Sequence, residues 1–554
     1  MDFFRRRLFF SKWLRHRLML CVFGTTMAVA GVSADATKSP YLQAREQASA
    51  AFNKGSFVEA EALLHSALAL LTDQRNSDAV VLWDELGEVH QAQGRFVDAE
   101  RDYQRALDIN TKLESPRAME TAIVLNNLGT LSEKRGRPAE AEALLRQSYS
   151  GLEKLSALDK PIAGSVISNL GLTLVEQAKY AEALPLYEQA LASISRSYGE
   201  KTIEFARALT NSALLSFELG NYSDALSKSR RALAIEDSLP FVSADDRSTT
   251  LNNLGLALVQ LGKYSEAEPF LLKGIALRKS SAGCFDSKLA ETLNNLAVAE
   301  RNLGKLEAAW GHDVEAIQII TDHPGSNSRV MPAIWNNMGL IAAAEKRYHE
   351  AESYYKKAAE AWLGTLGPES PKYAATLSNI AALESARGHH KAAQALQEKA
   401  LQIREQSLGA NHPSVASSLC NVAAELFYQK KYDEALTLYQ RAELIQEHSL
   451  GADAPDVARV WRNMAVVYRT TNQLKDAETA YRKAVAIGET AGGPNNPELS
   501  VWLQEYAEVL RKEQNFGEAE QAEVRAVGIQ VRNTIKATQA PPNSLLRGGS
   551  DSKD

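Results

Sequence analysis

The chain has 554 residues with a formal net charge of −6, because 68 aspartates and glutamates outnumber 62 lysines and arginines. Residues 1–34 hold six basic side chains and one acidic side chain, so the chain without them carries a net charge of about −11. Such an acidic balance argues against general nucleic-acid binding, which needs a basic surface, and no nucleic-acid partner is expected.

The first 34 residues have the layout of a secretory signal peptide. Residues 1–17 are basic, an apolar run extends from Leu18 to Ala30, and small residues follow, with cleavage expected after Ala34 or Ala36. The pair at 6–7 loosely resembles a twin-arginine export signal. The alternatives are an uncleaved membrane anchor, for which the apolar run is short, and a mitochondrial presequence. We therefore expect export to the periplasm or the extracellular space, without stable membrane insertion after signal cleavage.

From about residue 40 to residue 531 the sequence repeats every 42 residues. The segment Leu293-Asn294-Asn295-Leu296-Ala297 is matched by Leu251-Asn252-Asn253-Leu254-Gly255 before it and by Trp335-Asn336-Asn337-Met338-Gly339 after it. One column of this period is always alanine: Ala99, Ala141, Ala183, Ala225, Ala267, Ala309, Ala351, Ala393, Ala435, Ala477 and Ala519. Ala60 adds a twelfth copy after a shorter step of 39 residues. A fixed period of this size is typical of a solenoid of stacked units.

Each repeat is predicted to form two helices. In the seventh, the first helix spans about 288–303, a turn follows at Gly304-Lys305, and the second helix spans about 306–320. Prolines at 371, 413, 455 and 497 are expected to begin first helices, where a missing N–H costs little. The prediction is an all-α fold, a right-handed superhelix of about twelve helix-turn-helix repeats over residues 40–531. Residues 532–554 lack the period and are expected to form a disordered tail.

These columns resemble the tetratricopeptide repeat, with its bulky-x-x-x-small, Gly-x-aromatic and two-alanine pattern. The longer period, together with Ile403-Arg404-Glu405 and Leu408-Gly409-Ala410-Asn411-His412-Pro413, resembles the kinesin light chain variety of the repeat. A shared fold does not give a shared function, and the resemblance carries no motor role.

The sequence offers no motif for catalysis, for a metal or for a cofactor. His389 and His390 are adjacent, and adjacent helical residues do not share a face. No His-Glu-x-x-His, paired-cysteine or phosphate-binding glycine motif occurs. Because the repeats occupy most of the chain, we expect a protein that is not an enzyme and that binds no cofactor.

An asparagine column on the first helices is the main candidate for binding. It comprises Asn127, Asn169, Asn211, Asn253, Asn295, Asn337, Asn379, Asn421 and Asn463, with glutamate at 46, 85 and 505 in the end repeats. Asparagine is a mediocre helix former, so another interaction should hold it there. The resemblance implies that this position faces a concave groove, where the amide bonds the backbone or terminal carboxylate of an extended peptide. The alternative is a hydrogen bond between repeats that fixes their stacking, and one amide can do both.

Other positions expected to line the groove change character along the chain. They are acidic early on (Asp84, Glu85, Glu88), apolar in repeats four to six (Leu172, Val175, Leu214, Phe217, Leu256, Val259) and basic near the end (Arg459, Arg462, Arg469, Arg511, Lys512). We therefore expect a partner segment whose acidic stretch or carboxyl end lies beside the arginines. The alternatives are that these arginines only solvate an outer face and that the acidic start is a polar cap.

The sequence thus predicts an exported, non-enzymatic scaffold that binds protein or peptide segments in its concave groove. One alternative is a structural role, in which the solenoid associates with itself in an envelope assembly. Another is a regulatory subunit that senses a peptide.

Overall fold

The computed structural model describes residues 39–539 apart from 159, 178, 281–286 and 323–329. These residues are 84% helical and form 24 helices and no strands, which confirms the predicted all-α class. The expected signal peptide, residues 1–34, lies outside the described residues. Within the described part of the chain, no helix is long and apolar enough to cross a membrane.

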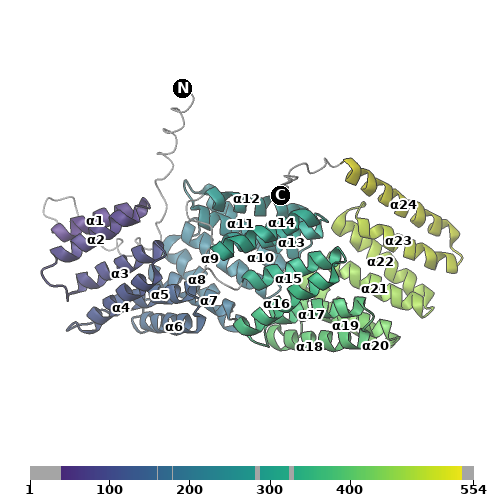
Figure 1. Cartoon of the computed structure of the whole chain (residues 1–554), viewed down its shortest axis with the longest axis horizontal. Coiled ribbons are helices and arrows are strands. Elements are labelled where there is room, and N and C mark those ends of the chain that lie inside the picture. Colours follow the sequence, from purple (N-terminus) through teal and green to yellow (C-terminus); the bar gives the residue numbers. More distant parts are fainter. Residues whose placement is uncertain (1–38, 159, 178, 281–286, 323–329, 540–554) are drawn as a thin grey trace, which may run out of the picture. The chain divides into compact units, whose positions relative to one another are not determined.

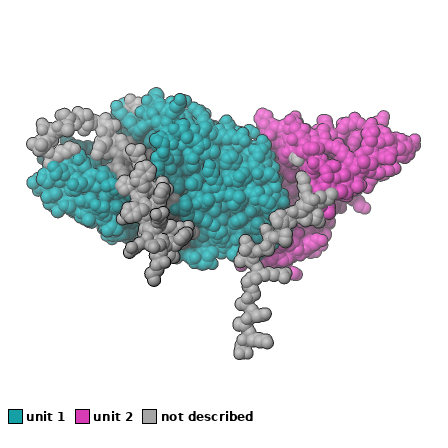
Figure 2. Space-filling view, turned by 90° about the horizontal axis from the view of Figure 1, so that it is seen from above, with its two compact units in different colours: residues 1–341 teal, residues 342–554 magenta. Residues whose placement is uncertain are grey.

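The chain divides into two compact units, residues 1–341 and residues 342–554 (Figure 2). The first contains α1 (Pro40–Asn53), α2 (Phe57–Leu70), α3 (Ser77–Ala92), α4 (Phe96–Thr111), α5 (Ala118–Lys134), α6 (Pro138–Lys154), α7 (Pro161–Glu176), α8 (Tyr180–Tyr198), α9 (Ile203–Glu218), α10 (Tyr222–Ser238), α11 (Ala244–Gln260), α12 (Tyr264–Ser280), α13 (Ser287–Asn302) and α14 (Leu306–Asp322). The boundary falls within α15 (Val330–Ala344). The second contains α16 (Tyr348–Leu366), α17 (Pro371–Ala386), α18 (His390–Leu408), α19 (Pro413–Tyr428), α20 (Tyr432–Leu450), α21 (Pro455–Thr470), α22 (Leu474–Gly492), α23 (Pro497–Lys512) and α24 (Phe516–Gln539) (Figure 1).

In each unit, an odd-numbered helix and the even-numbered helix after it form one repeat. The repeating alanines lie where the two helices meet, and every one from Ala99 to Ala519 is at most 2% exposed. A glycine or alanine on the odd-numbered helix faces a bulky side chain on the even-numbered one, as Gly255 faces Leu271 and Gly87 faces Tyr103. These small residues let the helices approach closely, as ridge-into-groove packing requires.

The predicted helix ends agree with the structure to within about two residues. Gly304 has φ of +77° at the turn between α13 and α14, and Pro371, Pro413, Pro455 and Pro497 begin α17, α19, α21 and α23. In some repeats another residue takes the left-handed turn position, as Lys346 and Asn472 do with φ of 61° each. A turn without glycine is therefore tolerated at this point, at some cost in backbone strain.

The odd-numbered helices form the inner layer of each unit. Consecutive odd-numbered helices pack against each other from α3 to α13, and so do α17 and α19, whereas each even-numbered helix packs mainly against the odd-numbered helices beside it. We use the term inner layer for the odd-numbered helices because they lie closest together. We call the exposed side of the odd-numbered helices the inner face.

The last helix extends beyond the expected end of the repeats at residue 531. Helix α24 continues to Gln539, and it is held to the α22–α23 loop past Val531. Arg532 Nε donates to Asn495 Oδ1 at 2.6 Å, and Asn533 Nδ2 donates to the Asn495 carbonyl at 3.2 Å. Residues 532–539 of the expected tail are therefore helical, and residues 540–554 lie outside the described residues.

Candidate functional site

A ladder of apolar side chains runs along the inner face of the first unit. Its members are 42 residues apart, one on each odd-numbered helix from α7 to α15, and each is partly exposed: Leu172, Leu214, Leu256, Val298 and Leu340. On α11, Asn253, Leu256 and Gln260 are three and four residues apart and so form one stripe, opposite the buried Leu254 and Leu258.

Leu172, Leu214 and Leu256 were expected from the sequence to line the groove, whereas Val298 and Leu340 were not. The period alone could have found them, because they occupy the same column. Two other residues expected in the groove, Val175 and Val259, are buried instead, at 6% and 5% exposed. Phe217, near the end of α9, is partly exposed and packs against Tyr222 with ring centroids 5.3 Å apart.

The asparagine column binds the preceding repeat. Four successive side-chain amides donate from Nδ2 to the residue that precedes the column in the previous odd-numbered helix. The pairs are Asn169 to Asn126 Oδ1 at 2.9 Å, Asn211 to Ser168 Oγ at 3.1 Å, Asn253 to the Thr210 carbonyl at 3.2 Å, and Asn295 to Asn252 Oδ1 at 2.9 Å. These hydrogen bonds join consecutive repeats, which is the alternative to ligand binding that the sequence left open.

Three other asparagines of the column also donate to a preceding helix, but to different acceptors. Asn127 donates to Asp84 at 3.1 Å and to Glu88 at 3.2 Å. Asn337 donates to Asp313 Oδ2 at 2.7 Å and Asn421 to Gln397 Oε1 at 3.4 Å, both on the preceding even-numbered helix. Asn463 accepts from Arg462 at 3.4 Å, and Asn379 is partly exposed in the same register.

Charged pairs replace the amide bond near both ends of the chain. Glu85 and Glu505 occupy the asparagine position, and each accepts from the arginine that precedes the column one repeat earlier. Arg45 Nη2 lies 2.6 Å from Glu85 Oε1, and Arg462 Nη2 lies 2.5 Å from Glu505 Oε1. The glutamates at the ends of the column therefore form a charged version of the same inter-repeat bond.

The other arginines expected to anchor an acidic ligand also have carboxylate partners. Arg459 pairs with Asp456 at 2.6 Å and with Glu498 at 3.2 Å, and Arg469 pairs with Glu508 at 2.7 Å. Arg511 pairs with Glu523 at 2.7 Å. The side chains of Arg459 and Arg511 are 41% and 49% exposed, so these pairs can exchange with an outside carboxylate more readily than the less exposed Arg462 pair.

The acidic residues of repeat two lie in the protein interior. Asp84, Glu85 and Glu88 are 8%, 5% and 9% exposed, between α1 and α5. Burial raises the pKa of Asp84 to about 7, and burial together with the nearby Asp84 raises the pKa of Glu88 well above its ordinary value. Burial also raises the pKa of Glu85, although Arg45 opposes this shift. From the sequence these residues were expected in the groove, and their burial and raised pKa values were not foreseen.

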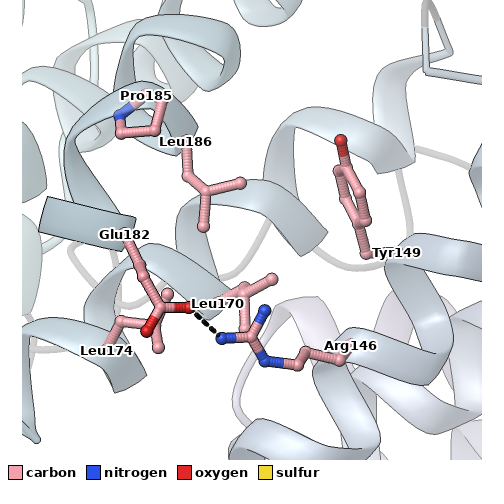
Figure 3. Close-up of a pocket in the computed structure, with 7 residues that line it drawn as sticks. All are labelled: Arg146, Tyr149, Leu170, Leu174, Glu182, Pro185 and Leu186. Carbon is pink, nitrogen blue, oxygen red and sulfur yellow. Dashed lines mark hydrogen bonds and ion pairs between the residues drawn. The ribbon is translucent and has the colours of Figure 1, made fainter. Parts of the chain in front are cut away.

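A cavity of about 360 Å³ lies between α6, α7 and α8 (Figure 3). Leu170, Leu174 and Leu186 are among the residues that line it, and Arg146 and Glu182, which also line it, form an ion pair of 2.6 Å. Its walls include the even-numbered helices, so it is not part of the inner face.

Among the described residues, no group of three or more His, Cys, Asp or Glu side chains is placed to hold a metal ion.

The comparisons with known proteins concern the repeats. The tetratricopeptide repeat family matches at residues 77–154, 163–238, 246–322, 330–406, 379–443, 414–490 and 456–530.

No curated protein matches the sequence significantly. Among solved structures, the crystal structure of BtubC (BKLC) from P. vanneervenii is 22% identical, with a TM-score of 0.34. That match covers 44% of this chain and 94% of that chain.

Proposed function

Since the chain belongs to the tetratricopeptide repeat family, we propose that it is a protein-interaction scaffold that binds an extended segment of a partner protein on its inner face. The observation that carries this proposal is the apolar ladder from Leu172 to Leu340. Five partly exposed apolar side chains in one register, on successive inner helices, form a continuous surface for the side chains of an extended chain.

The asparagine column supports the same surface in a second way. An amide that donates Nδ2 to the preceding repeat can still accept a bond from a peptide N–H through its oxygen. Asn169, Asn211 and Asn253 are partly exposed beside the apolar ladder. Each such bond contributes only about 0.5–1.5 kcal/mol net, so the amides align the bound segment and the apolar contacts supply most of the affinity.

The proposal also includes the variety of the repeat and the location of the protein. The 42-residue period and the segment Ile403-Arg404-Glu405 resemble the kinesin light chain variety of the repeat, and this resemblance implies no motor role. The basic start, the apolar run and the small residues before Ala36 indicate an exported protein in the periplasm or outside the cell.

The inner face can be tested by reversing its polarity in the first unit. We expect Leu214→Glu with Leu256→Glu to weaken binding of a partner captured from the native compartment by at least about tenfold, because a buried unpaired carboxylate opposes complex formation. Titration calorimetry with the purified partner gives the affinity, and circular dichroism verifies the fold.

The matched control is Leu184→Glu with Leu272→Glu, two leucines that are 44% and 45% exposed on the even-numbered helices α8 and α12. It should leave the affinity unchanged. Equal losses for the two pairs, or a loss for the control pair alone, would refute binding on the inner face.

The second unit provides a separate test of ligand charge. We propose that an acidic stretch or carboxyl end of the partner binds beside Arg459, Arg462, Arg469 and Arg511, and displaces Glu498 from Arg459 and Glu508 from Arg469. Arg459→Glu with Arg469→Glu should then weaken binding and flatten its salt dependence, because exposed charges are screened over about 8 Å at physiological ionic strength. An unchanged affinity and salt slope would show that these arginines only join repeats.

Export has its own test. A chain that lacks residues 1–34 should fold normally and stay in the cytoplasm, because that segment contributes to no repeat. Cell fractionation locates the truncated chain, and mass spectrometry of the native protein reads its N-terminus. An intact Met1 on the native protein would favour the membrane-anchored alternative.

A further inference from the structure

Two glutamates meet at the inner face of the first unit, next to the apolar ladder. Glu133 lies in the last turn of α5, Glu176 is the last residue of α7, and both are partly exposed. Glu176 follows Leu172 of the ladder by four residues, so the two lie on one face of α7. The carboxyl groups of Glu133 and Glu176 are hydrogen-bonded to each other. An ionised carboxylate only accepts hydrogen bonds, so this pair shares a proton.

The surroundings of Glu133 hold this proton at neutral pH. Loss of surrounding water and then the neighbouring Glu176 raise the pKa of Glu133 to about 8. Thr173 Oγ1, which donates to Glu133 Oε2 at 3.4 Å, and the adjacent Lys134 oppose the shift without cancelling it. Both glutamates also lie at helix C-termini, where the helix dipole disfavours an ionised carboxylate and favours a cation. A cation held between the two carboxylates would take the place of the proton.

A buried hydroxyl group without a partner lies close to the pair. Tyr187 of α8 is 1% exposed, and its Oη has no hydrogen-bond partner among the described residues. Two repeats earlier, the equivalent Tyr103 donates to Gln91 Oε1 at 3.4 Å. Val175 occupies the position of that glutamine in the repeat of Tyr187, and valine offers no acceptor. A buried donor without a partner costs free energy, so the repeat has left this hydroxyl for another acceptor.

The acceptors nearest to hand are the two carboxyl groups. Glu133 and Glu176 both raise the pKa of Tyr187 after the effect of burial, which places them close to its hydroxyl. The tyrosine ring lies against Gly171 of α7, where an added Cβ would be 3.0 Å from Tyr187 Cζ. While the carboxyl groups bond each other, the hydroxyl stays unused. When both are ionised, each needs more donors.

We propose that the partner segment on the inner face places a lysine or arginine side chain between Glu133 and Glu176, where it displaces their shared proton. This inference rests on the proposed function, because the same segment must also cover the apolar ladder. A guanidinium group can donate to both carboxylates at once, and Tyr187 can supply a further donor. Among the described residues, no group of three His, Cys, Asp or Glu side chains is placed to hold a metal, so the cation that fits is a basic side chain.

The spacing of the inner helices defines a probe for this site. Packed helices are about 8–10 Å apart, and an extended chain advances about 3.3 Å per residue, so every third residue of a bound segment meets a new repeat. The probe is a synthetic peptide with three leucines at every third position, an arginine three residues beyond each outer leucine, and serines between. Arginine at both ends makes the test independent of the direction of binding. The reference peptide carries citrulline, which resembles arginine in shape but is neutral.

Titration calorimetry of the full chain at pH 7, in buffers that differ in ionisation enthalpy, measures affinity and proton release together. The arginine peptide should bind at least about tenfold more tightly than the citrulline peptide and release close to one proton. Glu133→Gln with Glu176→Gln should abolish both the preference and the proton release. The control is Glu153→Gln with Glu188→Gln, two exposed glutamates on α6 and α8 of the same two repeats, and it should behave like the wild type.

The outcomes separate this inference from the proposed function. Leu214→Glu with Leu256→Glu should weaken both peptides, whereas the Glu133 and Glu176 exchanges should weaken only the arginine peptide. Equal affinity of the wild type for the two peptides, or a preference for arginine that survives the loss of both glutamates, would overturn the basic side chain and leave binding on the ladder standing. So would binding of the arginine peptide without proton release. Binding of neither peptide would overturn both proposals.

Discussion

Gly255→Leu is expected to lower the free energy of unfolding of the first unit by about 3 kcal/mol, the upper end of the usual range for overpacking. A Cβ atom at Gly255 would lie 2.5 Å from Leu271 Cγ and 2.6 Å from Leu271 Cδ2. Leu271 is fully buried between α11 and α12, so it has no free space into which to move. Urea denaturation followed by circular dichroism measures the loss.

The control is Gly311→Leu, the same exchange at an exposed helical glycine on α14, where an added Cβ meets no atom within 4 Å. This change should stabilise the chain slightly, because glycine is about 1 kcal/mol less favourable than the best helix formers. Leu271→Ala combined with Gly255→Leu should recover part of the loss, since the two side chains compete for one space. Equal effects of the two glycine exchanges would contradict the packing described for α11 and α12.

Periodicity determines where such packing contacts lie, and this is why the fold could be predicted. The alanine column marks the helix contacts, the prolines mark helix starts, and Gly304 marks a turn. Each of these features depends only on residues within one repeat. The same sequence could not reveal the partner of each asparagine, because that depends on how neighbouring repeats stack. Asn253 reaches the preceding odd-numbered helix.

Asn337 and Asn421 instead reach the preceding even-numbered helix. Asp313 and Gln397 stand there at the position that Leu271 fills in an earlier repeat. Asp313 and Gln397 bring a side-chain oxygen within reach of the amide, whereas Leu271 before Asn295 has no acceptor, and the hydroxyl of Ser229 before Asn253 has no hydrogen-bond partner among the described residues. The residue at one core position thus helps to decide which acceptor the asparagine side chain binds. The residues next to the asparagine in the sequence do not predict this choice.

The arginines near the end of the chain show a second limit. Arg462 and Arg469 were expected to share a helix face, and their seven-residue spacing is consistent with that. Their carboxylate partners, Glu505 and Glu508, lie about one repeat later in the sequence. Because these acids belong to the next inner helix, the charge that a ligand would meet is the sum of two repeats. The sequence pattern of one helix therefore overstates the positive charge at this surface.

The buried acids of α3 should make the first unit less stable as the pH rises from about 4 to about 7. Asp84 and Glu88 both accept from Asn127, and Glu85 and Arg45 are the charged groups beside them. Tyr103 of α4 lies close enough for both acids to raise its pKa further, after the effect of burial. Burial gives Asp84 a pKa of about 7 and raises the pKa of Glu88 well above its ordinary value, against about 4 for these groups in an unfolded chain.

At a pH between the pKa of the unfolded chain and that of the folded chain, the folded chain holds protons that the unfolded chain has released. Stability then falls with rising pH, by up to about 1.4 kcal/mol per pH unit for each such group. Asp84→Asn with Glu88→Gln should remove most of this dependence, because the neutral amides keep acceptors for Asn127 and need no proton. The double variant should therefore be more stable than the wild type at pH 7 and close to it at pH 4.

Hydrogen exchange of peptides from α3, corrected for the intrinsic effect of pH, measures this change where it arises. Glu59→Gln, at an exposed position on α2, is the control for loss of one surface charge and should leave the pH profile unchanged. Protection of α3 that rises with pH, or a profile that the double variant leaves intact, would show that Asp84 and Glu88 are ionised in the folded chain. In that case Arg45 and Asn127 would have to offset two buried charges, and loss of Arg45 alone should unfold the first repeats.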